Sequence, residues 1–304
     1  MRKPISQFAL ALVAASLFSQ VALAADTAKP VRVLASLPIT YGLASVLLKN
    51  TDVQLEQAAP GNLPGSRQSA YFSGRGAPAL QKLASGADAV IGLRALWPDD
   101  PLYPMARRSN IRIVEIDAVR PIDGSLPGVA LQPGAAHEGL NSQPWLASQN
   151  MGRMADVIAA DLVRLAPAAK KPVDANLAAL KQRLLKLSAE SETALAQADN
   201  LTVFSLSERL GYLASGLNLD LLGSDSRPDT EWSADALQDW QKQLQANDVK
   251  VVLAHREPAE PIKAAIGAAG SQLLVLPTDS ADPVAELEGN VGLLVKALTT
   301  APSR

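Results

Sequence analysis

Residues 83–93 read LASGADAVIGL, and they carry the clearest signal of the fold class. The residues before Gly86 complete a helical stretch that begins at residue 78, and residues 87–93 form a short apolar run. Such a run, bounded by turn residues, is typical of a strand that is buried on both faces. A helix followed at once by a buried strand is typical of α/β layering around a parallel sheet.

The same alternation continues on both sides of this stretch. We predict further strands and a helix in this half of the chain, at 31–35, 53–57 and 111–117 for the strands and at 41–49 for the helix. Proline- and glycine-rich segments at 59–65 and 121–139 are predicted to be loops. In a parallel sheet, the loops that follow strand ends are where ligands bind.

A long predicted helix separates this half of the chain from a second half in which strands and helices alternate in the same way. Leucines at 177, 180, 184 and 187 share one face of a helix predicted at 173–195. We then predict strands at 201–206, 219–223, 250–254 and 272–277, which alternate with helices at 208–215, from 233, at 261–269 and at 283–298. Ser233 and Asp282 are predicted N-caps of two of these helices. The periodicity therefore predicts the α/β class throughout.

The N-terminus has the features of a secretory signal peptide. Arg2 and Lys3 form a positive region, residues 8–18 form an apolar run, and residues 22–24 (ALA) match a cleavage site. The run is shorter than the roughly 20 apolar residues that span a bilayer. No cysteine follows the predicted cleavage site, so we expect an exported, soluble mature chain that lacks residues 1–24.

Composition narrows the function classes. The chain has 28 basic and 30 acidic side chains, and loss of Arg2 and Lys3 with the signal peptide leaves a net charge of about −4. That balance argues against nucleic acid as a partner, because nucleic-acid binding needs a basic face. The absence of cysteine excludes disulfides, thiolate zinc ligands and cysteine nucleophiles. About 280 residues remain after export, which favours two domains.

No catalytic motif stands out. Ser205 and Ser207 lie near a predicted strand-to-helix turn but lack the Gly-x-Ser-x-Gly pattern of a nucleophile elbow. The glycine-rich stretches at 74–76 and 267–270 do not follow a strand with the spacing of a phosphate-binding loop. We therefore expect that the protein is not an enzyme.

Three phrases of the chain resemble one protein family. Residues 83–93, 143–150 (QPWLASQN) and 210–219 (LGYLASGLNL) are similar to segments of the periplasmic zinc- and manganese-binding proteins of ABC importers. The resemblance covers nearly the whole mature chain. It implies a periplasmic clamshell of two α/β lobes joined by a long backbone helix, with the ligand between the lobes and an inner-membrane permease as partner. The implied domains are a signal peptide at 1–24, an N-terminal lobe at 25–170, a linking helix at 171–199 and a C-terminal lobe at 200–304.

The chain departs from this family at the metal ligands that the resemblance implies. The first ligand motif corresponds to residues 67–72 (RQSAYF), which contain no histidine. Gln143 stands at the place of the second ligand, Ser207 stands at the third, and Asp279 corresponds to the fourth, which is acidic. Gln143 and Ser207 offer neutral oxygen atoms, which are weak zinc ligands, so we expect a degenerate metal site.

Other side chains offer a way to rebuild that site. His137, Glu208, His255 and Asp279 are all expected on the cleft side, where they could converge on a divalent or chelated transition metal. The alternative is that both histidines are solvent-facing loop residues, since the chain has two histidines in all and no histidine-rich loop. The sequence assigns no cofactor beyond such a metal.

Arginines gather at the same predicted loops. Their planar guanidinium groups bind carboxylates or phosphates in a bidentate manner, and nearby aromatic rings could add stacking contacts. The candidate residues of this kind are Arg67, Arg94, Arg209, Arg256, Tyr71 and Trp145. An arginine-lined cleft would suit an anionic metal chelate such as a siderophore or metallophore. The alternative is that most of these arginines are solvated or structural.

Two hypotheses follow for the function. The first is a periplasmic solute-binding protein of a metal-type ABC importer, which handles a metal ion or a metal chelate with a degenerate metal site. The second is a non-transporting periplasmic protein that modulates a partner, such as a second binding protein or a transporter. Adjacent permease and ATPase genes would favour the first hypothesis.

Overall fold

The computed structural model describes residues 29–124, 126–134 and 139–300. These residues form two lobes, each built on a four-stranded parallel sheet. The predicted signal peptide lies outside the described residues. No helix in the described ranges combines the length and the apolar character that a bilayer crossing requires.

The N-terminal lobe has the strand order β2-β1-β3-β4. Its elements are β1 (Arg32–Ala35), α1 (Pro38–Leu47), β2 (Gln54–Gln57), α2 (Gly65–Ser73), α3 (Ala77–Ser85), β3 (Ala89–Gly92), α4 (Leu102–Arg107) and β4 (Val114–Asp117). The apolar run at 87–93 contains β3, which is fully buried between β1 and β4. The α/β class is confirmed, whereas α2 and α4 were not predicted.

The C-terminal lobe repeats the arrangement with the order β6-β5-β7-β8. Its elements are β5 (Thr202–Ser205), the 3-10 turn η3 (Glu208–Leu210), α7 (Gly211–Gly216), β6 (Asp220–Ser224), η4 (Asp229–Glu231), α8 (Ala234–Ala246), β7 (Val251–Ala254), α9 (Glu260–Ala268), β8 (Gln272–Val275) and α10 (Pro283–Thr299). The predicted caps are confirmed, because Ser233 accepts from the N–H of Ala236 and Asp282 accepts from the N–H of Ala285.

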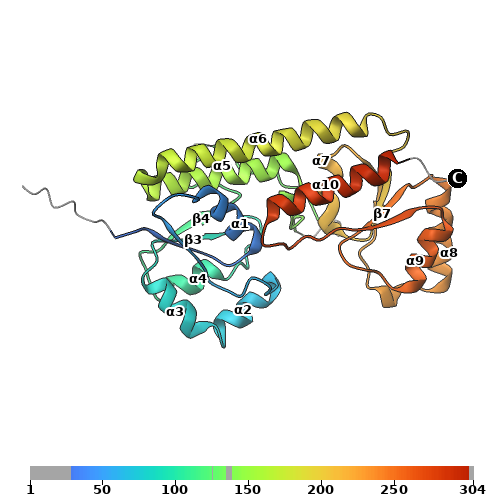
Figure 1. Ribbon diagram of the computed structural model, residues 1–304. Helices are drawn as coiled ribbons and strands as arrows, with labels where there is room; N and C mark the ends of the chain where they lie inside the picture. Colours follow the sequence, from blue (N-terminus) through green and yellow to red (C-terminus); the bar gives the residue numbers. More distant parts are fainter. Residues whose placement is uncertain (1–28, 125, 135–138, 301–304) are drawn as a thin grey trace, which may run out of the picture.

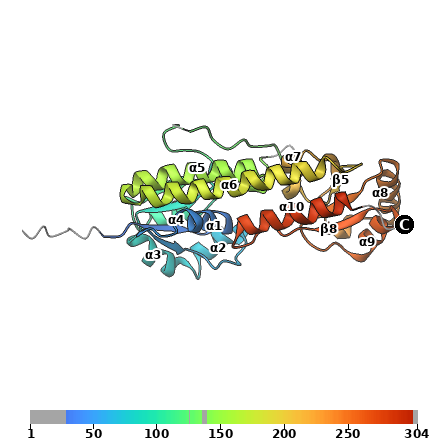
Figure 2. The same cartoon turned by 45° about the horizontal axis from the view of Figure 1, so that its top comes forward.

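Two long helices and α10 connect the lobes (Figures 1 and 2). The helix α6 (Lys170–Leu195) packs along α5 (Ser148–Leu165). The short turn η1 (Pro144–Leu146) precedes α5, and the short turn η2 (Pro167–Ala169) joins α5 to α6. Leu180 and Leu184 are buried on the predicted apolar face of α6. The C-terminal helix α10 begins beside α1 of the N-terminal lobe, packs on both α1 and α6, and runs back toward the C-terminal lobe (Figure 1). The residue limits of the predicted domains stay a prediction.

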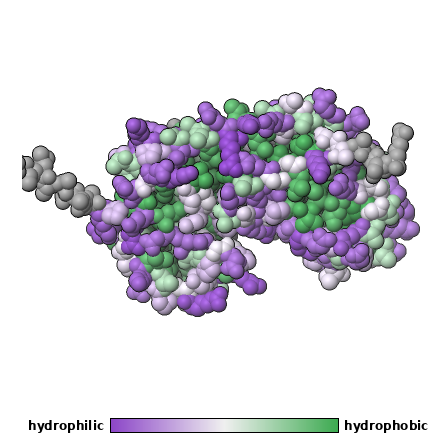
Figure 3. All heavy atoms as spheres, viewed as in Figure 1, coloured by the Kyte–Doolittle hydropathy of each residue, from purple (hydrophilic) through white to green (hydrophobic). Residues whose placement is uncertain are grey.

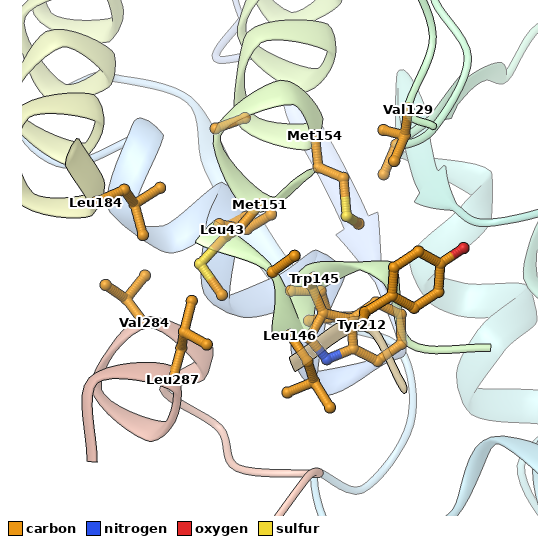
Figure 4. Close-up of a cluster of buried hydrophobic side chains, with 14 of the residues drawn as sticks. Leu43, Val129, Trp145, Leu146, Met151, Met154, Leu184, Tyr212, Val284 and Leu287 are labelled. Atoms are coloured by element: carbon orange, nitrogen blue, oxygen red, sulfur yellow. The ribbon is translucent and has the colours of Figure 1, made fainter. Parts of the chain in front are cut away.

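One hydrophobic core runs through the junction of the two lobes (Figure 4). It brings together Leu43 of α1, Leu146 of η1, Met151 of α5, Tyr212 of α7 and Leu287 of α10, each at most 1% exposed. Because these side chains come from both halves of the sequence, apolar burial holds the lobes together as well as each lobe by itself.

A glycine makes the contact between α1 and α10 possible. A Cβ atom on Gly42 would lie 2.3 Å from Cδ of Pro283, the first residue of α10. We therefore expect Gly42→Ala to push the two helices apart and to lower the free energy of unfolding by about 1–3 kcal/mol in urea denaturation. The matched variant Gly289→Ala adds a Cβ that meets nothing within 4 Å on α10, so it should stabilise the protein slightly. Equal stabilities of the two variants would rule out this close packing.

Candidate ligand cleft

A cleft of about 660 Å³ lies between the two lobes. We call it the inter-lobe cleft, and Figure 3 shows the molecular surface hollowed between the lobes. Its lining residues from the N-terminal half are Leu37, Pro38, Ile39, 61–66, Leu93, Leu96, Trp97, Leu140, Ser142, Gln143 and Trp145. From the C-terminal half they are Arg209, Thr278, Asp279, Ser280, Pro283 and Glu286. The lining is thus mostly apolar, with a few polar groups among the apolar ones.

The topology of both sheets places these residues at one cleft. Leu37 follows β1, Trp97 follows β3, Arg209 follows β5 and Asp279 follows β8. In a parallel sheet all these chain segments leave at the carboxyl edge, which is where ligands bind in open α/β sheets. The carboxyl edges of the two sheets therefore supply opposite walls of the cleft.

Gln143 contributes an unsatisfied hydrogen-bond acceptor to the cleft wall. Its side chain is 4% exposed, and its Oε1 atom has no hydrogen-bond partner within the described structure. Its backbone N–H donates to Oδ1 of Asn141 over 3.2 Å, which fixes the start of η1. A buried carbonyl oxygen without a donor is costly, so this position favours a ligand that donates a hydrogen bond. Trp145, two residues on, is 8% exposed in the same wall.

The first family ligand motif falls at a different place from the one expected. Arg67 and Tyr71 lie on α2 but do not line the inter-lobe cleft, and Tyr71 instead packs against Phe72 and beneath the guanidinium of Arg75. The cleft is lined by Gly65, the first residue of α2.

Gly65 lets the ring of Trp97 pack close to the backbone in the wall of the cleft. A Cβ atom on Gly65 would lie 3.0 Å from ring atoms of Trp97. No side chain therefore reaches the cleft from Gly65, and the indole of Trp97 lies against its backbone. Gly65 lies at the end of the predicted loop at 59–65 and was not predicted to be a site residue.

Arg209 and Asp279 form an ion pair at the edge of the cleft. Nη1 of Arg209 lies 2.7 Å from Oδ2 of Asp279 and donates to Oγ1 of Thr278 over 3.2 Å. Glu286 also lines the cleft, where it accepts the backbone N–H of Ser280, and burial raises the pKa of its carboxyl. Both acidic side chains of the described cleft lining are therefore already engaged by protein donors.

Ser207 and Glu208 lie in a second pocket rather than in the inter-lobe cleft. Ser207 is 2% exposed, and its Oγ atom has no hydrogen-bond partner within the described structure. Oε1 of Glu208 accepts the hydroxyl of Ser226 over 3.1 Å. Neighbouring residues of the turn after β5 thus face different cavities, because Arg209 turns toward the cleft.

His255 and Arg256 lie in a third, small pocket after β7. Burial lowers the pKa of His255, and the positive charges of Arg209 and Arg256 lower it further, which favours the neutral imidazole. Arg256 makes a bidentate pair with Asp229, at 2.7 and 3.1 Å. His137 lies outside the described residues.

Arg94 belongs to another surface of the N-terminal lobe. Its Nη1 lies 3.0 Å from Oε2 of Glu115, and its guanidinium also lies over the ring of Tyr103. Within residues 29–124, 126–134 and 139–300, no group of three or more histidine, aspartate or glutamate side chains is arranged to hold a metal. The structure therefore places Gln143, Trp145, Arg209 and Asp279 at one cleft, and the other candidates among the described residues lie elsewhere.

Two parallel-sheet lobes, a long connecting helix and one cleft between them define the class of metal-type solute-binding proteins. The chain belongs to the family described as zinc-uptake complex component A, periplasmic, whose model matches residues 85–299. The predicted family resemblance is confirmed. At the family level these are solute-binding proteins that work with ABC importers, not enzymes.

Solved structures agree with this assignment of the fold. A mutant of FpvC from Pseudomonas aeruginosa is similar with a TM-score of 0.71 and 21% identity, over 88% of this chain and 99% of that one. A zinc-bound deletion mutant of ZnuA has a TM-score of 0.67 and 21% identity, over 90% and 100%. Zn(II)-bound AdcA from Streptococcus pneumoniae has a TM-score of 0.67 and 16% identity, over 90% and 58%. A search of curated protein sequences found no significant match.

Proposed function

We propose that this protein is a periplasmic solute-binding protein of a metal-type ABC importer whose inter-lobe cleft takes a metal chelate rather than a naked ion. Relatives of similar fold were solved with zinc, nickel or manganese. The proposal for this chain depends on one observation: the described cleft lining holds no histidine and two carboxylates, one of which is paired with Arg209. A naked zinc ion needs three or four strong donors at once.

The cleft has the volume, the apolar surface and the hydrogen-bond acceptor that binding of an organic chelate requires. The coordination shell of a chelated metal is filled by the chelator, so the protein needs to bind the organic surface. The volume of about 660 Å³ lies within the usual range for organic ligands, and Trp97 and Trp145 supply broad apolar contact. Gln143 offers one acceptor for an N–H or O–H of the ligand.

The arginines favour a chelate of low net charge over a strongly anionic one. Arg209 is the one arginine of the described cleft lining and is paired with Asp279, so little positive charge is left uncompensated there; Arg94 and Arg256 lie elsewhere and are paired with Glu115 and Asp229. An anion could still use the part of the Arg209 guanidinium that does not face Asp279. Electrostatics would then orient the ligand, while apolar contact supplies most of the binding free energy.

Native mass spectrometry of the protein taken directly from the periplasm tests this function. We expect one adduct per chain, with the mass of an organic molecule and an associated metal. Trp97→Ala should reduce the adduct, because the indole forms the apolar wall beside Gly65. Leu185→Ala, on the exposed face of α6, serves as the control and should retain it.

Two results would contradict the proposed function. One bare zinc or manganese ion per chain would show direct metal binding instead. A chain without any adduct, whose melting temperature is also unchanged by periplasmic extract, would favour the second hypothesis, that of a protein that modulates a partner and transports nothing.

A further inference from the structure

The pocket beside Ser207 is distinct from the inter-lobe cleft, and we call it the hydroxyl pocket. It has a volume of about 280 Å³ and lies against β5, β6 and α7. Its lining residues are Gln132, Pro133, Asn141, Ser205, Ser207, Glu208, Gly211, Ser215, Leu219, Leu221 and Ser224. In Figure 2, the segment after β4 arches along α5 and reaches α7, which brings Gln132 and Asn141 to the C-terminal lobe.

The hydrogen-bond donors of this pocket are largely used within the protein. The hydroxyl of Ser205 donates to the carbonyl of Ser207 over 2.7 Å. The amide of Gln132 donates to Oγ of Ser215 over 3.0 Å, and the amide of Asn141 donates to the carbonyl of Glu208 over 2.8 Å. A ligand that relied on accepting hydrogen bonds would therefore have to compete with these internal bonds.

The acceptors of the pocket are less fully used. Oγ of Ser207 is buried in a residue that is 2% exposed and has no partner within the described structure, so its lone pairs as well as its O–H are unused. The carboxylate of Glu208 accepts the hydroxyl of Ser226 at Oε1 and has further acceptor capacity. A buried, unpartnered hydroxyl next to a carboxylate favours a ligand that donates several hydrogen bonds.

The charge of the lining favours a ligand whose hydrogen-bond donor is positively charged. Glu208 is the one charged side chain among the described lining residues, so the pocket carries a negative charge. The adjacent Arg209 does not cancel it, since its guanidinium lies 2.7 Å from Asp279 on the cleft side. A single carboxylate with neutral oxygens is too poor a donor set for a transition metal. It suits an ammonium group, which has one positive charge and three N–H donors.

We propose that the hydroxyl pocket binds a small organic ammonium ion, with its charged head between Glu208 and Ser207 and its methylene groups against Leu219 and Leu221. This site is separate from the chelate proposed for the inter-lobe cleft, and neither proposal depends on the other. Asn141, which lines the hydroxyl pocket, connects the two walls: its Nδ2 donates to the Glu208 carbonyl, while its Oδ1 accepts the N–H of Gln143, which lines the inter-lobe cleft.

Isothermal titration calorimetry with 4-aminobutan-1-ol tests the site, with 1,4-butanediol as a neutral probe of the same length. We expect the amine to bind at least about tenfold more tightly than the diol, because a charge-assisted hydrogen bond is lost in the diol. Glu208→Gln keeps an acceptor oxygen for Ser226 but removes the charge, and should weaken amine binding about tenfold. Ser207→Ala should weaken it by a smaller factor.

The control is Glu192→Gln, which removes the same charge from the exposed side of α6 and should leave amine binding unchanged. Melting curves of all variants would establish that each is folded. Equal affinity for amine and diol, unchanged amine affinity in Glu208→Gln, or no heat of binding with the amine in the unaltered protein would each overturn the proposal.

Discussion

Replacing Leu146 with alanine is expected to lower the free energy of unfolding by about 2–5 kcal/mol, as for other large side chains removed from cores. Leu146 is 1% exposed and lies in the core at the junction of the lobes (Figure 4). Its neighbours in that core come from α1, α5, α7 and α10, so the cavity would be surrounded by elements of both lobes. Urea denaturation followed by circular dichroism measures the change.

The control for Leu146→Ala is Leu185→Ala, which removes the same number of atoms from a leucine that is 71% exposed and should change the free energy of unfolding by less than about 0.5 kcal/mol. The shared core also predicts that both lobes unfold in one transition. Two separate transitions in the unaltered protein would contradict a continuous core, as would a loss below about 1 kcal/mol in Leu146→Ala.

The strands could be predicted from the sequence because most of them are short apolar runs. Residues 87–93 predict β3 well, since a strand that is buried on both faces must be apolar throughout. The prediction at 111–117 began too early, because β4 starts at Val114 and Ile111 is 76% exposed. An apolar side chain at the surface carries no signal that separates it from a buried one.

The helices α2 and α4 were missed for physical reasons. On α2, Gln68 and Phe72 are the buried positions, so a polar side chain occupies half of its inner face. Gln68 is fully buried and donates to the carbonyl of Ser36 over 2.9 Å, a contact that hydrophobic periodicity does not register. The short helix α4 contains Pro104, and because proline is disfavoured inside helices its sequence resembles a loop.

The candidate site was predicted in part, through the family motifs. Gln143 and Asp279 line one cleft, although they are more than a hundred residues apart. The turn after β5 shows the limit of sequence reasoning, because Ser207 and Arg209 are neighbours that face different cavities. The ion-pair partners of the arginines could not be predicted either. Glu115 lies 21 residues from Arg94 and Asp229 lies 27 residues from Arg256, and no local sequence pattern indicates these pairs.

Zinc titrated into the metal-free protein is expected to bind no more tightly than the micromolar range. Of the four positions that correspond to family ligands, Gln143 and Ser207 offer neutral oxygens, and Asp279 offers a carboxylate that is paired with Arg209. The first motif supplies no ligand, because its Arg67 and Tyr71 do not line the cleft. Each lost factor of ten in affinity corresponds to about 1.4 kcal/mol, so a change from nanomolar to micromolar binding requires the loss of only about 4 kcal/mol. Loss of two strong ligands readily accounts for that much.

Calorimetric titration of the chelator-treated protein with zinc, and then with manganese, therefore shows whether the cleft keeps the family frame without the donor atoms for a naked cation. We expect dissociation constants in the micromolar range or weaker for both metals, with little further change in Asp279→Asn. Nanomolar binding of either metal that is lost in Asp279→Asn would contradict it.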